Sequence, residues 1–88
     1  MRKEQIIKDV FAELKRAEEK FPGFPKDPIH AACVLAEENG ELQKAVLQWT
    51  YEKCSVMDVR AEAIQVAAMA LRFLFSLREV EPKQCPQV

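Results

Sequence analysis

The chain has 88 residues and a formal net charge of −1, so it is long enough for one modest core and lacks the basic surface that a polynucleotide backbone requires. Hydrophobic residues make up 49% of the chain and charged residues 31%, a balance that excludes a disordered polymer. With only two glycines and abundant alanine, leucine, glutamate and lysine, the composition favours helix over strand. We therefore expect a single all-α domain over residues 1–88.

The cysteine content indicates a cellular compartment. Cys33, Cys54 and Cys85 form an odd set without CxxC spacing, and the chain has one histidine, which disfavours a disulfide framework or a zinc site and fits a reducing cytoplasm. The charged amphipathic N-terminus and the interrupted apolar runs predict neither a signal peptide nor a membrane span. We expect a cytoplasmic protein with no membrane partner.

Hydrophobic periodicity predicts a first amphipathic helix from residue 3 to about residue 20, with apolar side chains at Ile6, Ile7, Val10, Phe11, Leu14 and Ala17. Residues 21–26 contain two prolines and a glycine and therefore predict a loop. Asp27 followed by Pro28 is typical of an N-cap with proline in the first helical position, so a second helix is expected over 28–49.

A polar connection over 50–54 should follow, and Ser55 with Asp58 three residues later resembles a capping box. This pair predicts a third helix from residue 55 to about residue 79. The prolines at 82 and 86 then indicate a flexible tail over 79–88. The expected architecture is a small helical bundle of three main helices, completed by oligomerisation.

Carboxylates lie on the apolar faces of the second and third helices. At 100° per residue, Glu38 lies in the middle of the apolar face of the second helix and Glu41 at its edge. Glu62 takes the same central position on the third helix, with Gln65 at the edge. If the two helices face each other, they pool their side-chain oxygens.

A carboxylate pair at helical spacing is more often part of a solvated face than of a site. The central position of Glu38 and of Glu62 on apolar stripes favours burial instead. A buried carboxylate persists only if it is paired, protonated or bound to a cation. Oxygen ligands without His or Cys favour a hard ion such as Mg²⁺, which commonly completes its octahedron with water and substrate phosphates.

The segment Glu37-Glu38-Asn39-Gly40-Glu41, followed by Glu62-Ala63-Ile64-Gln65, resembles the EExxE plus ExxD signature of the MazG-like and dimeric-dUTPase-like nucleotide pyrophosphohydrolases. The resemblance covers roughly residues 30–74. It implies the all-α fold of that superfamily and hydrolysis of a nucleoside triphosphate to a monophosphate and pyrophosphate by a metal-activated water.

The resemblance also implies roles for single residues. Glu38, Glu41 and Glu62 would be Mg²⁺ ligands, Glu37 would hold a ligand or a water, and Glu37 and Glu38 are the candidate catalytic residues. Gln65 stands where the family has an aspartate, and an amide oxygen can bind Mg²⁺ but adds no charge. Asp58, one turn before Glu62, is a candidate to compensate.

Basic and aromatic side chains are the candidates for binding the substrate. Lys53, Arg72 and Lys44 could contact phosphate oxygens, although most lysines and arginines are simply solvated. Trp49, Phe24 and His30 could form a base pocket. For Trp49 and Phe24, packing in the core is at least as expected as binding a base. For His30, we expect a surface or capping position.

The third helix is apolar nearly all round, because Ile64, Ala67, Leu71, Leu74 and Phe75 lie opposite its acidic face. This pattern predicts a homo-oligomer, a dimer or a tetramer, with the third helix at or near the interface. The competing interpretation is a catalytically weakened helical module that binds a partner protein or a nucleotide without turnover. A ferritin-like di-iron site is excluded by the absence of ExxH.

Overall fold

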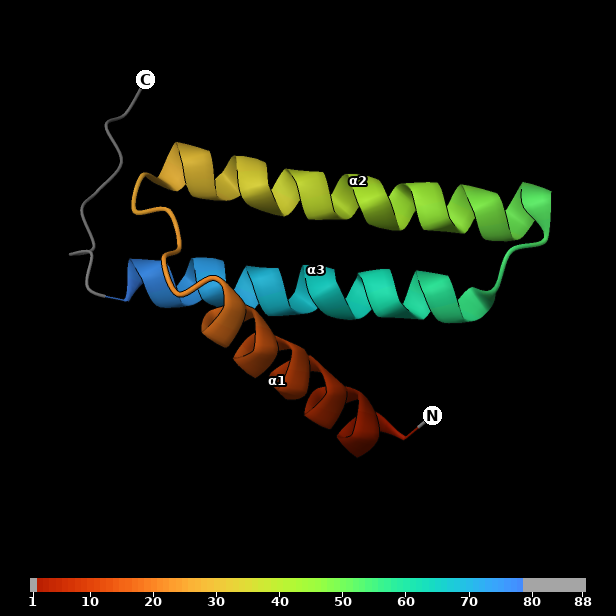
Figure 1. Cartoon of the computed structure of the whole chain (residues 1–88), viewed down its shortest axis with the longest axis horizontal. Coiled ribbons are helices and arrows are strands. Elements are labelled where there is room, and N and C mark those ends of the chain that lie inside the picture. Colours follow the sequence, from red (N-terminus) through yellow and green to blue (C-terminus); the bar gives the residue numbers. More distant parts are fainter. Residues whose placement is uncertain (1, 79–88) are drawn as a thin grey trace, which may run out of the picture.

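A computed structural model of the chain describes residues 2–78 and contains three α-helices, with no strand in that range. The helices are α1 (Lys3–Lys20), α2 (Pro28–Glu52) and α3 (Val56–Leu77). The all-α prediction with three main helices is confirmed (Figure 1). The predicted tail over 79–88, with Cys85, lies outside the described residues.

Two side-chain caps fix where α2 and α3 begin. The carboxylate of Asp27 accepts a hydrogen bond from the Ile29 N–H at 3.0 Å, and proline follows in the first helical turn. The hydroxyl of Ser55 accepts one from the Met57 N–H, also at 3.0 Å. Each cap satisfies one of the N–H groups that the first helical turn leaves without an intrahelical partner. The predicted starts of both helices are therefore confirmed.

The second helix continues three residues beyond the predicted end at Trp49, so the polar connection predicted over 50–54 is too long. Thr50 remains helical, and its hydroxyl donates to the Val46 carbonyl at 2.8 Å. Lys53 ends the helix in a left-handed conformation with φ of 56°, and its N–H and that of Cys54 both bond to the Gln48 carbonyl. The polar composition of this segment therefore did not locate the end of the helix.

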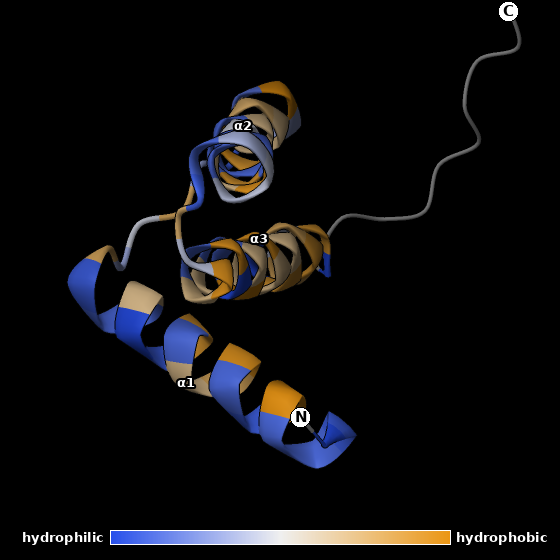
Figure 2. Cartoon of the chain, turned by 90° about the vertical axis from the view of Figure 1, so that its right-hand side faces the viewer, coloured by the Kyte–Doolittle hydropathy of each residue, from blue (hydrophilic) through white to orange (hydrophobic). Residues whose placement is uncertain are grey.

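The third helix is the centre of the fold. α2 and α3 run antiparallel as a hairpin, and α1 crosses the other side of α3 at a steep angle (Figure 1). Figure 2, turned by 90°, shows α3 lying between α2 and α1, and hydrophobic residues alternating with hydrophilic ones along α1. Within the described chain α1 and α2 form no helix–helix contact with each other. α3 therefore carries nearly all the tertiary packing.

The core between the helices is made mostly of small side chains. The buried apolar residues are Leu14, Ala17, Ala31, Ala45 and Ala68. Alanines allow helix axes to approach closely, but they bury little apolar area, and burial of apolar area is the main driving force of folding. Among the described residues no large side chain is completely buried. The core of a single chain is consequently thin.

Many large apolar side chains remain exposed on the single chain. They include Phe11 on α1, Leu47 and Tyr51 on α2, and Leu74 on α3, each at least half exposed. α1 covers part of the α3 face that the sequence left without a partner, but Leu74 and Phe75 stay exposed. Within residues 2–78, no helix combines the length and the apolar run needed to cross a membrane.

The loop between α1 and α2 is attached to α3 by one buried arginine. Arg72 is only 7% exposed, and its Nη2 donates to the carbonyl oxygen of Phe21 at 2.5 Å. Its guanidinium also stacks over the ring of Phe24, with 5.0 Å between the guanidinium carbon and the ring centroid. A hydrogen bond from a charged donor and a cation–π contact together hold this loop in place.

Candidate functional site

Glu38 and Glu62 lie half-buried between α2 and α3, on the faces that the sequence predicted. α2 and α3 run antiparallel, and the charge of Glu62 on α3 acts on the Glu38 carboxyl across the contact between the two helices. Gln65 is also half-buried, whereas Glu41 is exposed at the edge of the contact. The hairpin therefore places Glu38 and Glu62 on the same stretch of the α2–α3 contact, and we call the set Glu38, Glu41, Glu62 and Gln65 the acidic groove.

The charge of the acidic groove acts mainly on Glu38. Burial raises the pKa of the Glu38 carboxyl, and the negative charges of Glu62, Glu41, Glu13 and Glu37 raise it further. Each of these four carboxylates therefore lies within electrostatic range of Glu38. The ionised form of Glu38 is therefore disfavoured in the chain without a bound cation.

Glu13 is the member of this group that sequence reasoning missed. It lies on α1 and is half-buried, with a side chain that is 17% exposed. On a helical wheel it borders the apolar stripe formed by Val10, Leu14 and Ala17, so its position beside the core was a usable signal. What the wheel could not show was that α1 crosses α3 beside the acidic groove.

Among the described residues, none of the ion pairs neutralises Glu38 or Glu62. Arg16 on α1 pairs with Glu13 of the same helix. Arg60 approaches Asp9, with 3.8 Å between Nη2 and Oδ2. The groove thus concentrates carboxylates without an equal number of cations, an arrangement that a bound divalent ion would relieve.

The donors of the acidic groove fit Mg²⁺ in their chemistry. They are all oxygen atoms from carboxylates and one amide, which are the ligands that this hard cation takes, together with water and phosphate. In residues 2–78 no three carboxylate, histidine or cysteine side chains converge closely enough to hold an ion as they stand. The Glu13 carboxylate is paired with Arg16 on α1.

The predicted substrate-binding residues do not gather in one place. Lys53 is exposed at the α2–α3 connection, twelve residues after Glu41 and therefore about 18 Å away along the helix axis. His30 is exposed in the first turn of α2, about 12 Å along the axis from Glu38. Trp49 is 47% exposed and does not pack in the core of the single chain. Lys44 is exposed near the middle of α2, next to the buried Ala45.

Phe24 and Arg72 are brought together, at the opposite end of the hairpin from Lys53. Arg72 follows Glu62 by ten residues, about 15 Å along α3. Together with Lys26, Phe24 and Arg72 line a cavity of about 580 Å³ beside the α1–α2 loop. Arg72 therefore has a structural role in holding this loop, and any contact with a substrate would be additional to it.

Asp58, the candidate to compensate for Gln65, is exposed in the first turn of α3. An acidic side chain in that turn is favourable for the helix dipole, which accounts for its position without a ligand.

Comparison with protein-family models, with curated proteins and with solved structures finds no match for this chain.

Proposed function

We propose that this protein is a Mg²⁺-dependent nucleoside triphosphate pyrophosphohydrolase of the MazG-like type, which releases a nucleoside monophosphate and pyrophosphate. The observation that carries the proposal is the meeting of Glu38 and Glu62 across the α2–α3 contact without a neutralising cation. The order of Glu37, Glu38, Glu41 and Glu62 along the chain, which resembles the EExxE and ExxD motifs, supports the same conclusion.

Glu38, Glu41 and Glu62 are the carboxylates that would hold the cation. When bound, Mg²⁺ would supply charge neutralisation for the polyphosphate and a lowered pKa for a coordinated water. Glu37 is exposed one residue before Glu38 and close enough to influence the Glu38 carboxyl, so it can accept a hydrogen bond from a water beside the groove. Orientation of that water is the contribution that these side chains make to the reaction.

Gln65 sets the charge of the groove. Its amide oxygen can serve as a neutral ligand, which leaves three carboxylates on α2 and α3 for the cation. A fourth carboxylate at this position would strengthen cation binding but would also increase repulsion in its absence. We expect Gln65→Asp to bind Mg²⁺ more tightly and to be less stable than the wild type when EDTA is present.

A homo-oligomer, a dimer or a tetramer, is part of the proposal. Its support is the thin core of the single chain together with large exposed apolar side chains on all three helices. Three of them lie near the C-terminal end of α3, namely Leu74, Phe75 and Leu77, so α3 lies at or near the proposed interface. A monomeric mass by light scattering at micromolar concentration would contradict this part of the proposal.

The second candidate function is a helical module that binds a partner protein or a nucleotide without turnover. It is favoured by Gln65, which removes a charge from the groove, and by the lack of three converging metal-binding side chains among the described residues. Metal dependence separates the two candidates, because an enzyme of the proposed kind requires Mg²⁺ and a packing module does not.

The test is pyrophosphate release from a panel of canonical and modified nucleoside triphosphates, with Mg²⁺ or with EDTA. The variants are Glu38→Gln, Glu62→Gln and Gln65→Asp, and Glu19→Gln is the control because Glu19 is exposed at the end of α1, away from the groove. We expect the wild type to release pyrophosphate with Mg²⁺ and not with EDTA. The rate of release should fall at least about a hundredfold in Glu38→Gln and Glu62→Gln and should not change in the control.

Release that persists in EDTA, or in Glu38→Gln at the wild-type rate, would overturn the enzymatic proposal. Silence of the wild type with activity gained in Gln65→Asp would instead support the binding module, with a groove that has lost its catalytic charge.

A further inference from the structure

A cavity of about 320 Å³ lies between α1 and α3, next to the acidic groove. Its lining includes Gln65, which belongs to the groove, and Glu13, Arg16 and Asp9 from α1. Arg16 is the one basic side chain among its lining residues. The cavity therefore places a guanidinium group in the same hollow as Gln65, one of the proposed ligands.

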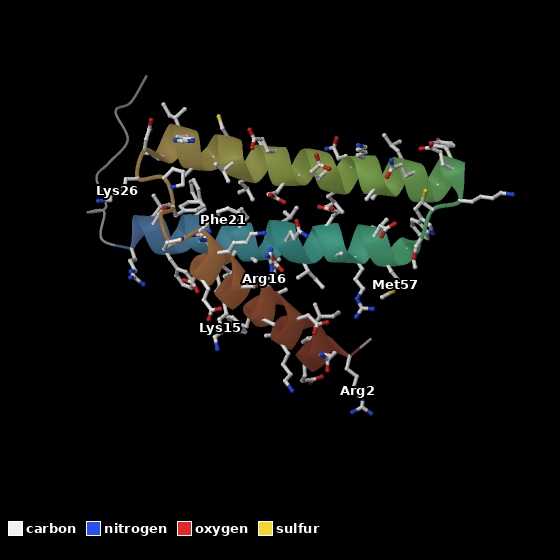
Figure 3. The ribbon with its side chains drawn as sticks, in the orientation of Figure 1. Arg2, Lys15, Arg16, Phe21, Lys26 and Met57 are labelled. Atoms are coloured by element: carbon white, nitrogen blue, oxygen red, sulfur yellow. The ribbon has the colours of Figure 1, made fainter. Side chains whose placement is uncertain are left out.

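Arg16 and Glu13 form a two-point ion pair on the same helix. Nε of Arg16 donates to Oε1 of Glu13 at 2.9 Å, and Nη2 donates to Oε2 at 2.6 Å. The side chain of Arg16 is 53% exposed and that of Glu13 is 17% exposed, so solvent reaches this pair from the arginine side. Arg16 lines this cavity together with residues of α3, whereas the neighbouring Lys15 points away from the bundle (Figure 3). Exposed ion pairs of this kind contribute little to stability and exchange readily with other partners.

The other well-placed cations of the described chain have different partners or positions. Arg60 lies next to Asp9, Arg72 is buried against Phe21 and Phe24, and Lys53 lies beyond the end of α2. The planar fork of a guanidinium binds a phosphate in the same two-point way as it binds a carboxylate. The carboxylate of Glu13 thus occupies the position on Arg16 that a phosphate could take.

Binding of a polyphosphate beside the acidic groove requires a cation such as the guanidinium of Arg16. A nucleoside triphosphate brings a chain of negative charge toward five carboxylates, and one divalent ion cannot neutralise both. An arginine beside the groove would neutralise the phosphates that the metal does not contact.

We propose that Arg16 is the phosphate-binding residue of this site, and that a polyphosphate takes the place of Glu13 on its guanidinium while the freed Glu13 carboxylate turns toward the acidic groove. This inference rests on the proposed function. The exchange adds a fourth carboxylate to the groove at the moment when the metal and the phosphates arrive, which offsets the charge missing at Gln65. It also identifies the ligand class as compounds with a di- or triphosphate chain.

The test measures two affinities by calorimetry, that of Mg²⁺ alone and that of inorganic tripolyphosphate in the presence of Mg²⁺. Arg16→Gln is compared with Lys15→Gln, which removes a charge from the next residue on a side chain that points away. We expect Arg16→Gln to weaken tripolyphosphate binding about tenfold to a hundredfold, the range for loss of a charged hydrogen bond. Binding of Mg²⁺ alone should be unchanged or tighter, and Lys15→Gln should resemble the wild type.

Two further variants test the exchange itself. Arg16→Lys keeps the charge but not the fork, so its affinity for tripolyphosphate should be intermediate. Glu13→Gln should lower the affinity for Mg²⁺ in the complex with tripolyphosphate. The contact between Arg16 and tripolyphosphate should still form in this variant. Helical circular dichroism of each variant establishes that the fold is retained.

If the wild type binds Mg²⁺ and tripolyphosphate and Arg16→Gln does so equally well, the role of Arg16 is wrong and the proposed function is unaffected. If the wild type binds neither, both proposals are overturned.

Discussion

Glu38 on α2 and Glu62 on α3 bring like charges together across the main helix–helix contact, and burial adds to the cost of ionising Glu38. Such a pair lowers the stability of a chain that holds no cation, because the two carboxylates repel each other. When a cation is bound, both carboxylates attract it and the pair raises the stability of the folded chain. The stability of the chain should therefore depend on both Mg²⁺ and pH.

Glu38→Gln should raise the melting temperature in EDTA by a few degrees, since it removes one charge from the groove and keeps the shape of the side chain. In Mg²⁺ the order should reverse, because the variant loses a ligand and with it the stabilisation that the ion provides. Differential scanning calorimetry in both buffers measures the effect. Glu19→Gln, exposed at the end of α1, should respond equally in both buffers, and a Mg²⁺ shift retained in Glu38→Gln would contradict the prediction.

The raised pKa of Glu38 predicts how stability depends on pH in the absence of metal. The folded chain takes up a proton on Glu38 at a higher pH than the unfolded chain does, so the contribution of this group to stability increases as pH falls from neutrality toward the ordinary carboxyl range. The affinity for Mg²⁺ should fall over the same range, because the proton competes with the ion.

Urea denaturation at several pH values, for the wild type and Glu38→Gln, isolates this contribution from the other titrating groups. The difference between the two midpoints should shrink as pH falls, since the wild-type side chain becomes neutral like that of the variant. A difference that is constant with pH would show that Glu38 is not the titrating group.

Arg72→Met should destabilise the fold by about 1–3 kcal/mol, because the Phe21 carbonyl loses its charged donor and the Phe24 ring loses its stacked partner. The α1–α2 loop should also become more sensitive to trypsin at Lys26. Arg60→Gln is the control, because its ion pair with Asp9 is long and partly exposed and should cost less than about 0.5 kcal/mol. Equal losses of unfolding free energy in the two variants would show that the contacts of Arg72 stabilise the fold no more than the Arg60–Asp9 ion pair does.

Lys53→Gly should stabilise the chain by about 0.5–1 kcal/mol, since Lys53 has a φ of 56° at the end of α2 and glycine adopts this conformation without strain. Lys44→Gly, within the same helix, should destabilise by about 1 kcal/mol. If chemical denaturation gives changes of opposite sign in the free energy of unfolding for the two variants, the left-handed conformation at the end of α2 is confirmed. If Lys53→Gly also lowers nucleotide affinity, the substrate-binding role predicted for Lys53 gains support despite its distance from the groove.

The sequence by itself determined the local features of this protein. Proline and glycine in the first loop, the caps at Asp27 and Ser55, and the 3.6-residue period of the apolar side chains act over a few residues, so they fixed the helices and their starts. The same period placed Glu38 and Glu62 at the centres of two apolar faces, because the direction of a side chain on a helix depends only on its position.

Only the tertiary structure decided which distant residues meet. The contact of Arg72 with Phe21, 51 residues apart, the approach of Glu13 to the acidic groove, and the separation of Lys53 from Arg72 all depend on how the helices cross. That crossing is set by the packing of small buried residues such as Ala45 and Ala68 at the helix contacts. Packing of this kind is a property of surfaces in space, and a helical wheel drawn for one segment does not contain it.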